Sequence, residues 1–139
     1  MAALLIRRAR PEDLDDLGEM IEDFVRGHPA KPKPRSRDRL REAYFGKAPV
    51  ARLFVAERDA RVVGMGQWYR IYDVFWSTFG GYAEWLYVRP AARCQGVSVA
   101  LIAAICDDVR SSGGEFINSS YSEELTSLYE RFAVGFANR

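Results

Sequence analysis

The segment from Val88 to Gly113 constrains the fold of this chain more than any other part of it. An apolar stretch ends at Val88, a short polar loop with one glycine follows, and apolar residues then recur every three or four positions. This spacing is typical of the buried face of an α-helix, and a glycine such as Gly113 is a usual helix end. The buried helical positions are Leu101, Ile102, Ile105, Cys106 and Val109. The segment therefore predicts a strand, a tight loop and a helix that packs back onto a sheet.

The loop itself has the composition of an anion site. It consists of Arg93, Cys94, Gln95, Gly96, Val97 and Ser98. The first N–H groups of a helix have no partner within the helix, so together they favour an anion. Gly96 lets the backbone approach a ligand closely, Ser98 offers a small hydroxyl, and Arg93 suits a phosphate. The alternative is a plain connection between strand and helix, because so short a pattern also arises by chance.

The rest of the chain predicts one α/β domain over residues 1–139 with a mixed sheet. Strands are expected at 4–9, 53–57, 62–72, 82–88, 115–119 and 134–139. Helices are expected at 11–25, 37–46, from 97 to Gly113, and at 122–132, with loops at 27–37 and at 73–81, the latter containing Gly80-Gly81. Strands 53–57 and 62–72 should pair as a hairpin, and 82–88 continues them as an antiparallel meander. The strand–helix–strand passage from 82 to 119 requires a parallel pair in that sheet.

Composition removes several classes of function. The net charge of +1 is too small for a general nucleic-acid binder. His28 is the only histidine, which argues against a histidine-based triad or zinc centre, and the two cysteines, Cys94 and Cys106, have no metal spacing. We expect no metal site. No apolar run reaches a membrane span and no export signal is visible, so we expect a cytoplasmic protein that does not bind membranes.

Three stretches together resemble the GNAT superfamily of acyl-CoA-dependent N-acetyltransferases. They are Tyr82-Ala-Glu-Trp-Leu-Tyr-Val88 with Pro90, the R-x-x-G-x-S loop with its helix, and Leu128-Tyr129-Glu130-Arg131. Within the superfamily the chain is most similar to the polyamine and small-amine acetyltransferases. The resemblance implies a three-layer fold whose mostly antiparallel sheet has a splayed parallel pair at the cofactor site.

The resemblance also implies acetyl-CoA as cofactor and assigns the residues that hold it. Backbone groups of Leu86, Tyr87 and Val88 would pair with the pantetheine arm, as a strand is added to a sheet edge. Residues Cys94 to Ser98 would surround the pyrophosphate, with Arg93 beside it. Ser122 stands where the family often has an asparagine that contacts the cofactor.

Acetyl transfer to an amine needs a base and an acid, and with one histidine these must come from other side chains. The resemblance places the base on Glu84 and the acid on Tyr129. A solvent-facing strand residue is the alternative for Glu84, and a core aromatic is the alternative for Tyr129. A phenol with a pKa near 10 can donate to a thiolate whose acid has a pKa near 8.5.

The C-terminal part departs from the family pattern. Ala133-Val134 replace the usual Gly-Phe after the tyrosine, or Gly135-Phe136 are its displaced form. The chain ends at Arg139, where the family completes a final strand pair. We expect that the last strand is lost, that the chain is cut short, or that a second subunit completes the sheet in a homodimer. These departures keep open a non-catalytic acyl-CoA-binding module.

The acceptor is expected to be the primary amine of a small molecule, with a peptide or protein amine as the alternative. Aromatic residues before Glu84 could line an acceptor pocket, although most are expected to be core and only one or two to touch the substrate: Trp68, Tyr69, Tyr72, Phe75 and Trp76. A basic run is expected to border the acceptor groove or to be a solvated segment: Lys31, Lys33, Arg35, Arg37, Arg39 and Arg41. A cationic rim would repel a polyamine and would suit an acceptor with acidic groups.

Overall fold

The structure, a computed structural model, describes residues 2–30 and 36–119, and within them lies a five-stranded sheet. In spatial order the strands are β1 (Leu5–Arg8), β2 (Arg52–Arg58), β3 (Arg61–Asp73), β4 (Thr78–Val88) and β5 (Ile117–Ser119). Neighbouring strands are antiparallel, except that β4 and β5 are parallel. This confirms the predicted mixed sheet. The predicted splay of the parallel pair would begin after Ser119, outside the described residues.

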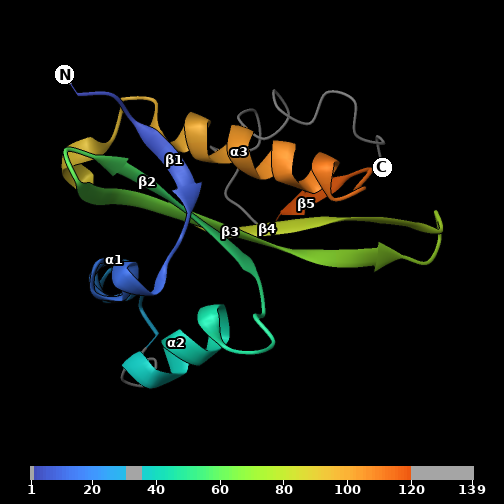
Figure 1. Cartoon of the computed structure of the whole chain (residues 1–139), viewed down its shortest axis with the longest axis horizontal. Helices are drawn as coiled ribbons and strands as arrows, with labels where there is room; N and C mark the ends of the chain where they lie inside the picture. Colours follow the sequence, from blue (N-terminus) through green and yellow to red (C-terminus); the bar gives the residue numbers. More distant parts are fainter. Residues whose placement is uncertain (1, 31–35, 120–139) are drawn as a thin grey trace.

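Helices cover both faces of this sheet. Helices α1 (Leu14–Arg26) and α2 (Arg37–Phe45) lie on one face, and α3 (Val97–Ser111) lies on the other (Figure 1). The larger core fills the space beneath α3: Phe54, Ala56, Trp68, Ala83, Val88, Leu101, Ile102, Ile105, Cys106 and Val109. A second core lies beneath α1 and α2: Leu17, Met20, Leu53, Val55, Val62, Met65 and Tyr87. The predicted three layers are therefore confirmed.

The helix boundaries differ from the expected ones mainly at the first helix. Residues Pro11–Asp13 form a 3₁₀ turn, and the α-helix begins at Leu14 and ends at Arg26. Proline fits this first turn because its missing N–H would have had no partner there. No helix in the described parts of the chain is long and apolar enough to cross a membrane.

The expectation of a loop over the whole of 73–81 is wrong, because β4 begins at Thr78 and contains both glycines. The glycines are needed for packing rather than for a turn. A Cβ at Gly80 would lie 2.5 Å from the Phe116 ring, and one at Gly81 would lie 2.7 Å from Val109. Side chains of α3 and the segment after it therefore lie directly on the backbone of β4. The result is a long β3–β4 ribbon that extends beyond the helices (Figure 1).

Arg89 fixes α1 against the end of β4. Its side chain is buried, and its Nε donates to the Val62 carbonyl at 2.8 Å. Nη2 donates to Asp16 at 3.0 Å, and Nη1 donates to Glu19. Because both carboxylates belong to α1, one arginine links the helix to two strands. The distance between α1 and the end of β4 is set by this clamp.

Candidate active site

Strand β4 contains a bulge at its centre. Gln67 of β3 is paired with Glu84 and Met65 is paired with Tyr87, so Trp85 and Leu86 together oppose Gly66. Trp85 has a φ of +59°, a left-handed conformation that is uncommon for a bulky residue. Two residues opposite one is the arrangement of a β-bulge, which redirects side chains and interrupts the ladder. The bulge therefore begins one residue after the predicted base and includes the first predicted pantetheine residue.

A cleft of about 740 Å³ opens next to the bulge. Its walls are the C-terminal end of α1, the end of β4 and the beginning of α3. The lining residues are Asp23, Phe24, Arg26, Gly27, His28, Leu86, Tyr87, Val88, Pro90, Arg93 and Ser98. Five of the residues that the sequence predicted for cofactor binding thus line one cavity. The sequence missed the α1 wall, because Phe24 and its neighbours showed only the spacing of a buried helix face.

The predicted anion loop lies at the beginning of α3, as expected. Gly96 is the residue before the helix and has a φ of +83°, and Cys94 has a φ of +62°. Residues Arg93 to Gly96 are exposed and Val97 is buried. A Cβ at Gly96 would meet nothing within 4 Å, so the backbone conformation rather than lack of space favours glycine here. The exposed loop and the N–H groups of the first helical turn together form a surface suited to a phosphate.

Two side chains of the loop hold its shape. Arg93 Nε donates to the Val88 carbonyl at 2.9 Å, and its guanidinium carbon lies 5.5 Å from the centre of the Tyr87 ring. Gln95 accepts from Arg58 at 2.6 Å and donates to the Ala91 carbonyl at 3.1 Å. The remaining guanidinium nitrogens of Arg93, at the wall of the cleft, are the groups that would meet a phosphate. Gln95 fixes the loop to the neighbouring β2–β3 end of the sheet.

Glu84 is held by a chain of hydrogen bonds that sequence reasoning did not find. Gln67 Nε2 donates to Glu84 Oε1 at 3.3 Å, and the Tyr44 hydroxyl donates to Gln67 Oε1. Burial, followed by the charge of Glu84, raises the pKa of Tyr44 to about 12, so its hydroxyl stays protonated at neutral pH. No local pattern could have revealed this chain, because it joins α2, β3 and β4. Glu84 is partly buried and oriented, unlike a free solvent-facing residue.

The aromatic candidates for an acceptor pocket separate into three groups. Trp68 is buried beneath α3, where its Nε1 donates to Asp108 at 2.8 Å, so it is one of the aromatics that belong to the core. Tyr69 stacks on Tyr82 at 5.3 Å between ring centres. Tyr69 pairs with Tyr82 two residues along from the Gln67–Glu84 pair, so it lies on the Glu84 side of the sheet. Burial, then the charges of Glu84 and Tyr82, raises the pKa of Tyr69.

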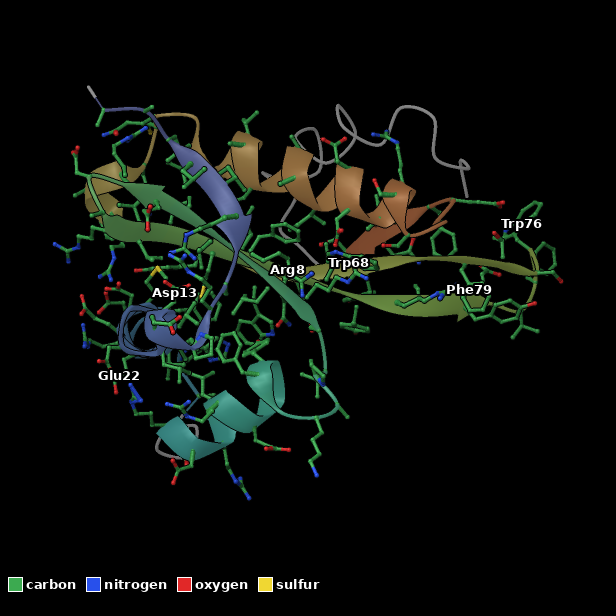
Figure 2. All side chains as sticks on the ribbon, viewed as in Figure 1. Arg8, Asp13, Glu22, Trp68, Trp76 and Phe79 are labelled. Atoms are coloured by element: carbon green, nitrogen blue, oxygen red, sulfur yellow. The ribbon has the colours of Figure 1, made fainter. Side chains whose placement is uncertain are left out.

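The third group lies at the outer end of the β3–β4 ribbon. Tyr72, Phe75 and Trp76 are all at least half exposed there. Figure 2 shows Trp76 and Phe79 at the tip of the ribbon, beyond the helices, while Trp68 lies at its base. Distance along the strand therefore removes the tip residues from the neighbourhood of Glu84.

Half of the basic run can be located. Lys31, Lys33 and Arg35 lie outside the described residues. Arg37 opens α2 and binds Asp15 of α1 at 3.1 Å, so that cation is paired with a carboxylate. Arg39 and Arg41 are exposed on α2.

Two predicted site residues, Ser122 and Tyr129, also lie outside the described residues. Among residues 2–30 and 36–119, no group of three or more His, Cys, Asp or Glu side chains is arranged to hold a metal ion.

Comparison with known proteins shows which family the chain belongs to. The sequence model of the Acetyltransferase (GNAT) family matches residues 17–136. The chain belongs to the GNAT acetyltransferase family. A curated relative of this GNAT protein is the thialysine N-epsilon-acetyltransferase of Mus musculus, 30% identical over 122 residues that cover 81% of this chain and 71% of the relative. The same enzyme of Sus scrofa is 29% identical over the same coverage.

Solved structures agree on the fold of the GNAT protein. Glucosamine-6-phosphate N-acetyltransferase from Arabidopsis thaliana has a TM-score of 0.76 at 16% identity, covering 99% of this chain and 93% of that chain. A predicted acetyltransferase from Clostridium acetobutylicum with acetyl-CoA has a TM-score of 0.74 at 15% identity, covering 99% and 92%. The predictions of the family and of an acetyl-CoA-dependent acetyltransferase are confirmed.

The described residues fit the acetyl donor. A cleft of about 740 Å³ falls within the range of roughly 300–1,000 Å³ that is usual for ligand sites. Its phosphate end would be the helix N-terminus after Gly96, and its other end reaches the bulge at Leu86. The donor supplies an activated acetyl group, and the chain must supply the base, the acid and the alignment of the acceptor.

Proposed function

We propose that this enzyme acetylates a primary amine of a small molecule by direct attack of the amine on the thioester of acetyl-CoA. The curated relatives support this class of acceptor, because they are named for acetylation of thialysine at its N-epsilon amine. Thialysine is an amino acid with a primary amine at the end of its side chain. At about 30% identity we propose the class of acceptor, a small primary amine, rather than thialysine itself.

The observation that supports the proposal most is the hydrogen-bond chain from Tyr44 through Gln67 to Glu84. Alkylamines are mostly protonated at neutral pH, so a base must take a proton before or during attack. Gln67 donates to Glu84 Oε1, so this oxygen is already paired with an amide N–H. We assign Oε2 to the acceptor ammonium. Because Glu84 directly precedes the bulge, the base and the end of the cofactor cleft belong to the same stretch of β4.

The acid is assigned to Tyr129 on the resemblance alone. As the new C–N bond forms and the C–S bond breaks, Glu84 removes the proton of the amine, directly or through a water molecule. Tyr129 donates its phenolic proton to the departing sulfur. The first proton of the ammonium passes to solvent before attack. Afterwards solvent takes the second proton from Glu84 and returns one to Tyr129, so the products are the amide, the free thiol and one released proton. No metal takes part in this scheme.

The cofactor side is proposed as follows. Backbone groups of Leu86, Tyr87 and Val88 would pair with the pantetheine arm along the cleft. The loop from Arg93 to Ser98 would hold the pyrophosphate, and Ser122 would add a contact from the C-terminal part. A cytoplasmic location and a homodimer stay predictions from the sequence.

A panel of amines tests the proposal. Purified enzyme and acetyl-CoA are mixed with thialysine, lysine, alkylamines, polyamines or a peptide with a free N-terminus, and release of the thiol is followed. We expect turnover with a small primary amine. Turnover only with the peptide would contradict the proposed acceptor class.

The role of Glu84 is tested with a substitution of the same shape. Glu84→Gln should lower kcat/KM by roughly 100-fold or more, the usual contribution of a general base, without changing the Kd of acetyl-CoA. Glu12→Gln is the matched control, because Glu12 is exposed in the 3₁₀ turn before α1. An unchanged rate in Glu84→Gln would show that another group is the base.

A further inference from the structure

A second cavity lies beside the cofactor cleft, on the face of the sheet that α1 and α2 cover. It has a volume of about 280 Å³ and is lined by Leu17, Ile21, Val25, Tyr44, Leu53, Met65 and Trp85. Phe24 lines the cofactor cleft and Trp85 lines this cavity, and their rings pack edge to face with centres 5.1 Å apart. The Phe24–Trp85 pair is therefore a partition between the two spaces. We call the smaller space the inner pocket.

The chemistry of the inner pocket excludes a charged occupant. None of the described residues that line it has a formal charge, and the polar groups among their side chains are the Tyr44 hydroxyl and the Trp85 indole N–H. The Tyr44 hydroxyl is already committed to Gln67, so its hydrogen is not offered to the pocket. An ammonium or carboxylate placed here would lose its hydration without gaining an opposite charge, which is strongly unfavourable. An uncharged hydrocarbon chain has no hydrogen bonds to water to lose, and it would bury apolar surface.

The size of the inner pocket exceeds what an acetyl group needs. An apolar cavity of about 150 Å³ is large enough to bind benzene, which has six carbons. The inner pocket is nearly twice as large, and the methyl of an acetyl group would leave most of it empty. Its position at Trp85, the first residue of the bulge, is where the proposed path of the donor ends.

We propose that the inner pocket receives the hydrocarbon tail of the acyl donor, so that the enzyme also uses acyl-CoA thioesters of about four to six carbons. This inference rests on the proposed course of the donor along Leu86–Val88. The reaction is the same as with acetyl: the C–S bond of the thioester breaks, a C–N bond to the amine forms, and the amine proton ends on the base. Phe24 and Trp85 set the entry for the tail. The pocket is assigned to the acyl chain rather than to the acceptor, because Glu84 is not among its lining residues.

The expected effect follows from the burial of methylene groups. Each buried methylene improves an equilibrium constant by roughly fourfold. Hexanoyl-CoA has four more than acetyl-CoA, which gives a ceiling of roughly 250-fold. Ordering the chain opposes this gain, so we expect hexanoyl-CoA to bind at least tenfold more tightly than acetyl-CoA.

The test measures binding alone, so it does not depend on the acceptor. Dissociation constants of coenzyme A, acetyl-CoA, butyryl-CoA and hexanoyl-CoA are measured by calorimetry with the full chain. Val25→Phe adds volume to the inner pocket from a partly exposed position on α1, and Ile21→Phe does so one turn earlier. Val50→Phe is the matched control, because Val50 is 63% exposed and does not line the pocket. Thermal unfolding confirms that each variant is folded.

In the native chain and in Val50→Phe, the dissociation constant should fall as the acyl chain lengthens. In Val25→Phe the advantage of hexanoyl-CoA should disappear while acetyl-CoA binds within about twofold of native. A flat or rising series in the native chain overturns the inference, as does an advantage that persists in both filled variants. If acyl-CoA binds as expected but no amine is acetylated, the proposed acceptor fails and the inner pocket stands. A separate steady-state series with alkylamines of increasing length checks the other occupant. If the KM of the amine falls as the alkylamine lengthens while the Kd of acyl-CoA does not change with the acyl chain, the pocket belongs to the acceptor and the inference is overturned.

Discussion

The two ends of α3 offer a comparison that isolates the role of the anion loop. Gly96 precedes the helix with a φ of +83°, and Gly113 follows it with a φ of +84°. A Cβ at either position would meet nothing within 4 Å. Alanine at either glycine therefore has the same left-handed strain and no clash. The strain amounts to about 1–2 kcal/mol for an L-residue.

Gly96→Ala and Gly113→Ala should lower the free energy of unfolding by the same amount, about 1 kcal/mol, measured by urea denaturation. Their effects on acetyl-CoA should differ. The helix of fifteen residues separates the two sites by roughly 22 Å. Only at Gly96 would the added methyl meet a bound pyrophosphate, so we expect its Kd for acetyl-CoA to rise at least tenfold, which corresponds to about 1.4 kcal/mol. Equal dissociation constants in the two variants, at equal stability, would refute the close approach of ligand and loop.

Three further predictions concern the residues around the site. Gln67→Leu should lower kcat/KM about tenfold in a steady-state assay. This is the lower end of the effect expected for loss of a hydrogen bond to a charged group, because the bond from Gln67 to Glu84 is 3.3 Å long. Tyr44→Phe leaves that bond intact and should have a smaller effect in the same assay. Arg89→Met should lower the free energy of unfolding in urea by about 2 kcal/mol, because the Val62 carbonyl loses a charged donor; an unchanged midpoint would show that the clamp is not needed. Burial opposes ionisation of Asp13, but hydrogen bonds from Arg7 and from the Arg10 N–H outweigh it and hold its pKa below the usual value of 3.8. The stability that ionised Asp13 contributes is then present above pH 4 or so and is lost as the pH falls further. Asp13→Asn should therefore lose less of its free energy of unfolding than the native chain between pH 6 and pH 3. Equal losses would contradict a lowered pKa of Asp13.

The strand, loop and helix of the proposed cofactor site could be predicted from the sequence because they are local. The strand before Arg89, the loop at Gly96 and the helix that ends at Gly113 follow one another, and their periodicity and glycines are visible in one segment. Left-handed backbone at both glycines is what their positions at the ends of a helix lead one to expect.

The contacts around Glu84, where we propose that the acceptor binds, could not be predicted because they are distant in sequence. Glu84 is oriented by Gln67, which in turn binds Tyr44 on another helix, and neither has a distinctive local pattern. The bulge at Trp85 is visible only in the register between β3 and β4. For the same reason Trp68 was placed among the acceptor candidates, although the alternation along β3 turns it toward α3 and Asp108.

Gly80-Gly81 show a different limit. Paired glycines are common in turns, and the sequence alone favoured a loop. Here the glycines lie within β4 because Phe116 and Val109 pack against its backbone. A glycine that makes room for a distant side chain looks the same in sequence as one that allows a turn.

A crystal structure of the enzyme with coenzyme A would test the central claim most directly. The claim is that the donor lies in the cleft between the end of α1, the end of β4 and the beginning of α3. The account predicts pyrophosphate oxygens within hydrogen-bond distance of the N–H groups after Gly96, and the pantetheine arm alongside Leu86–Val88 with its thiol near Trp85. Coenzyme A bound elsewhere, for example on the aromatic tip of the β3–β4 ribbon, would contradict it.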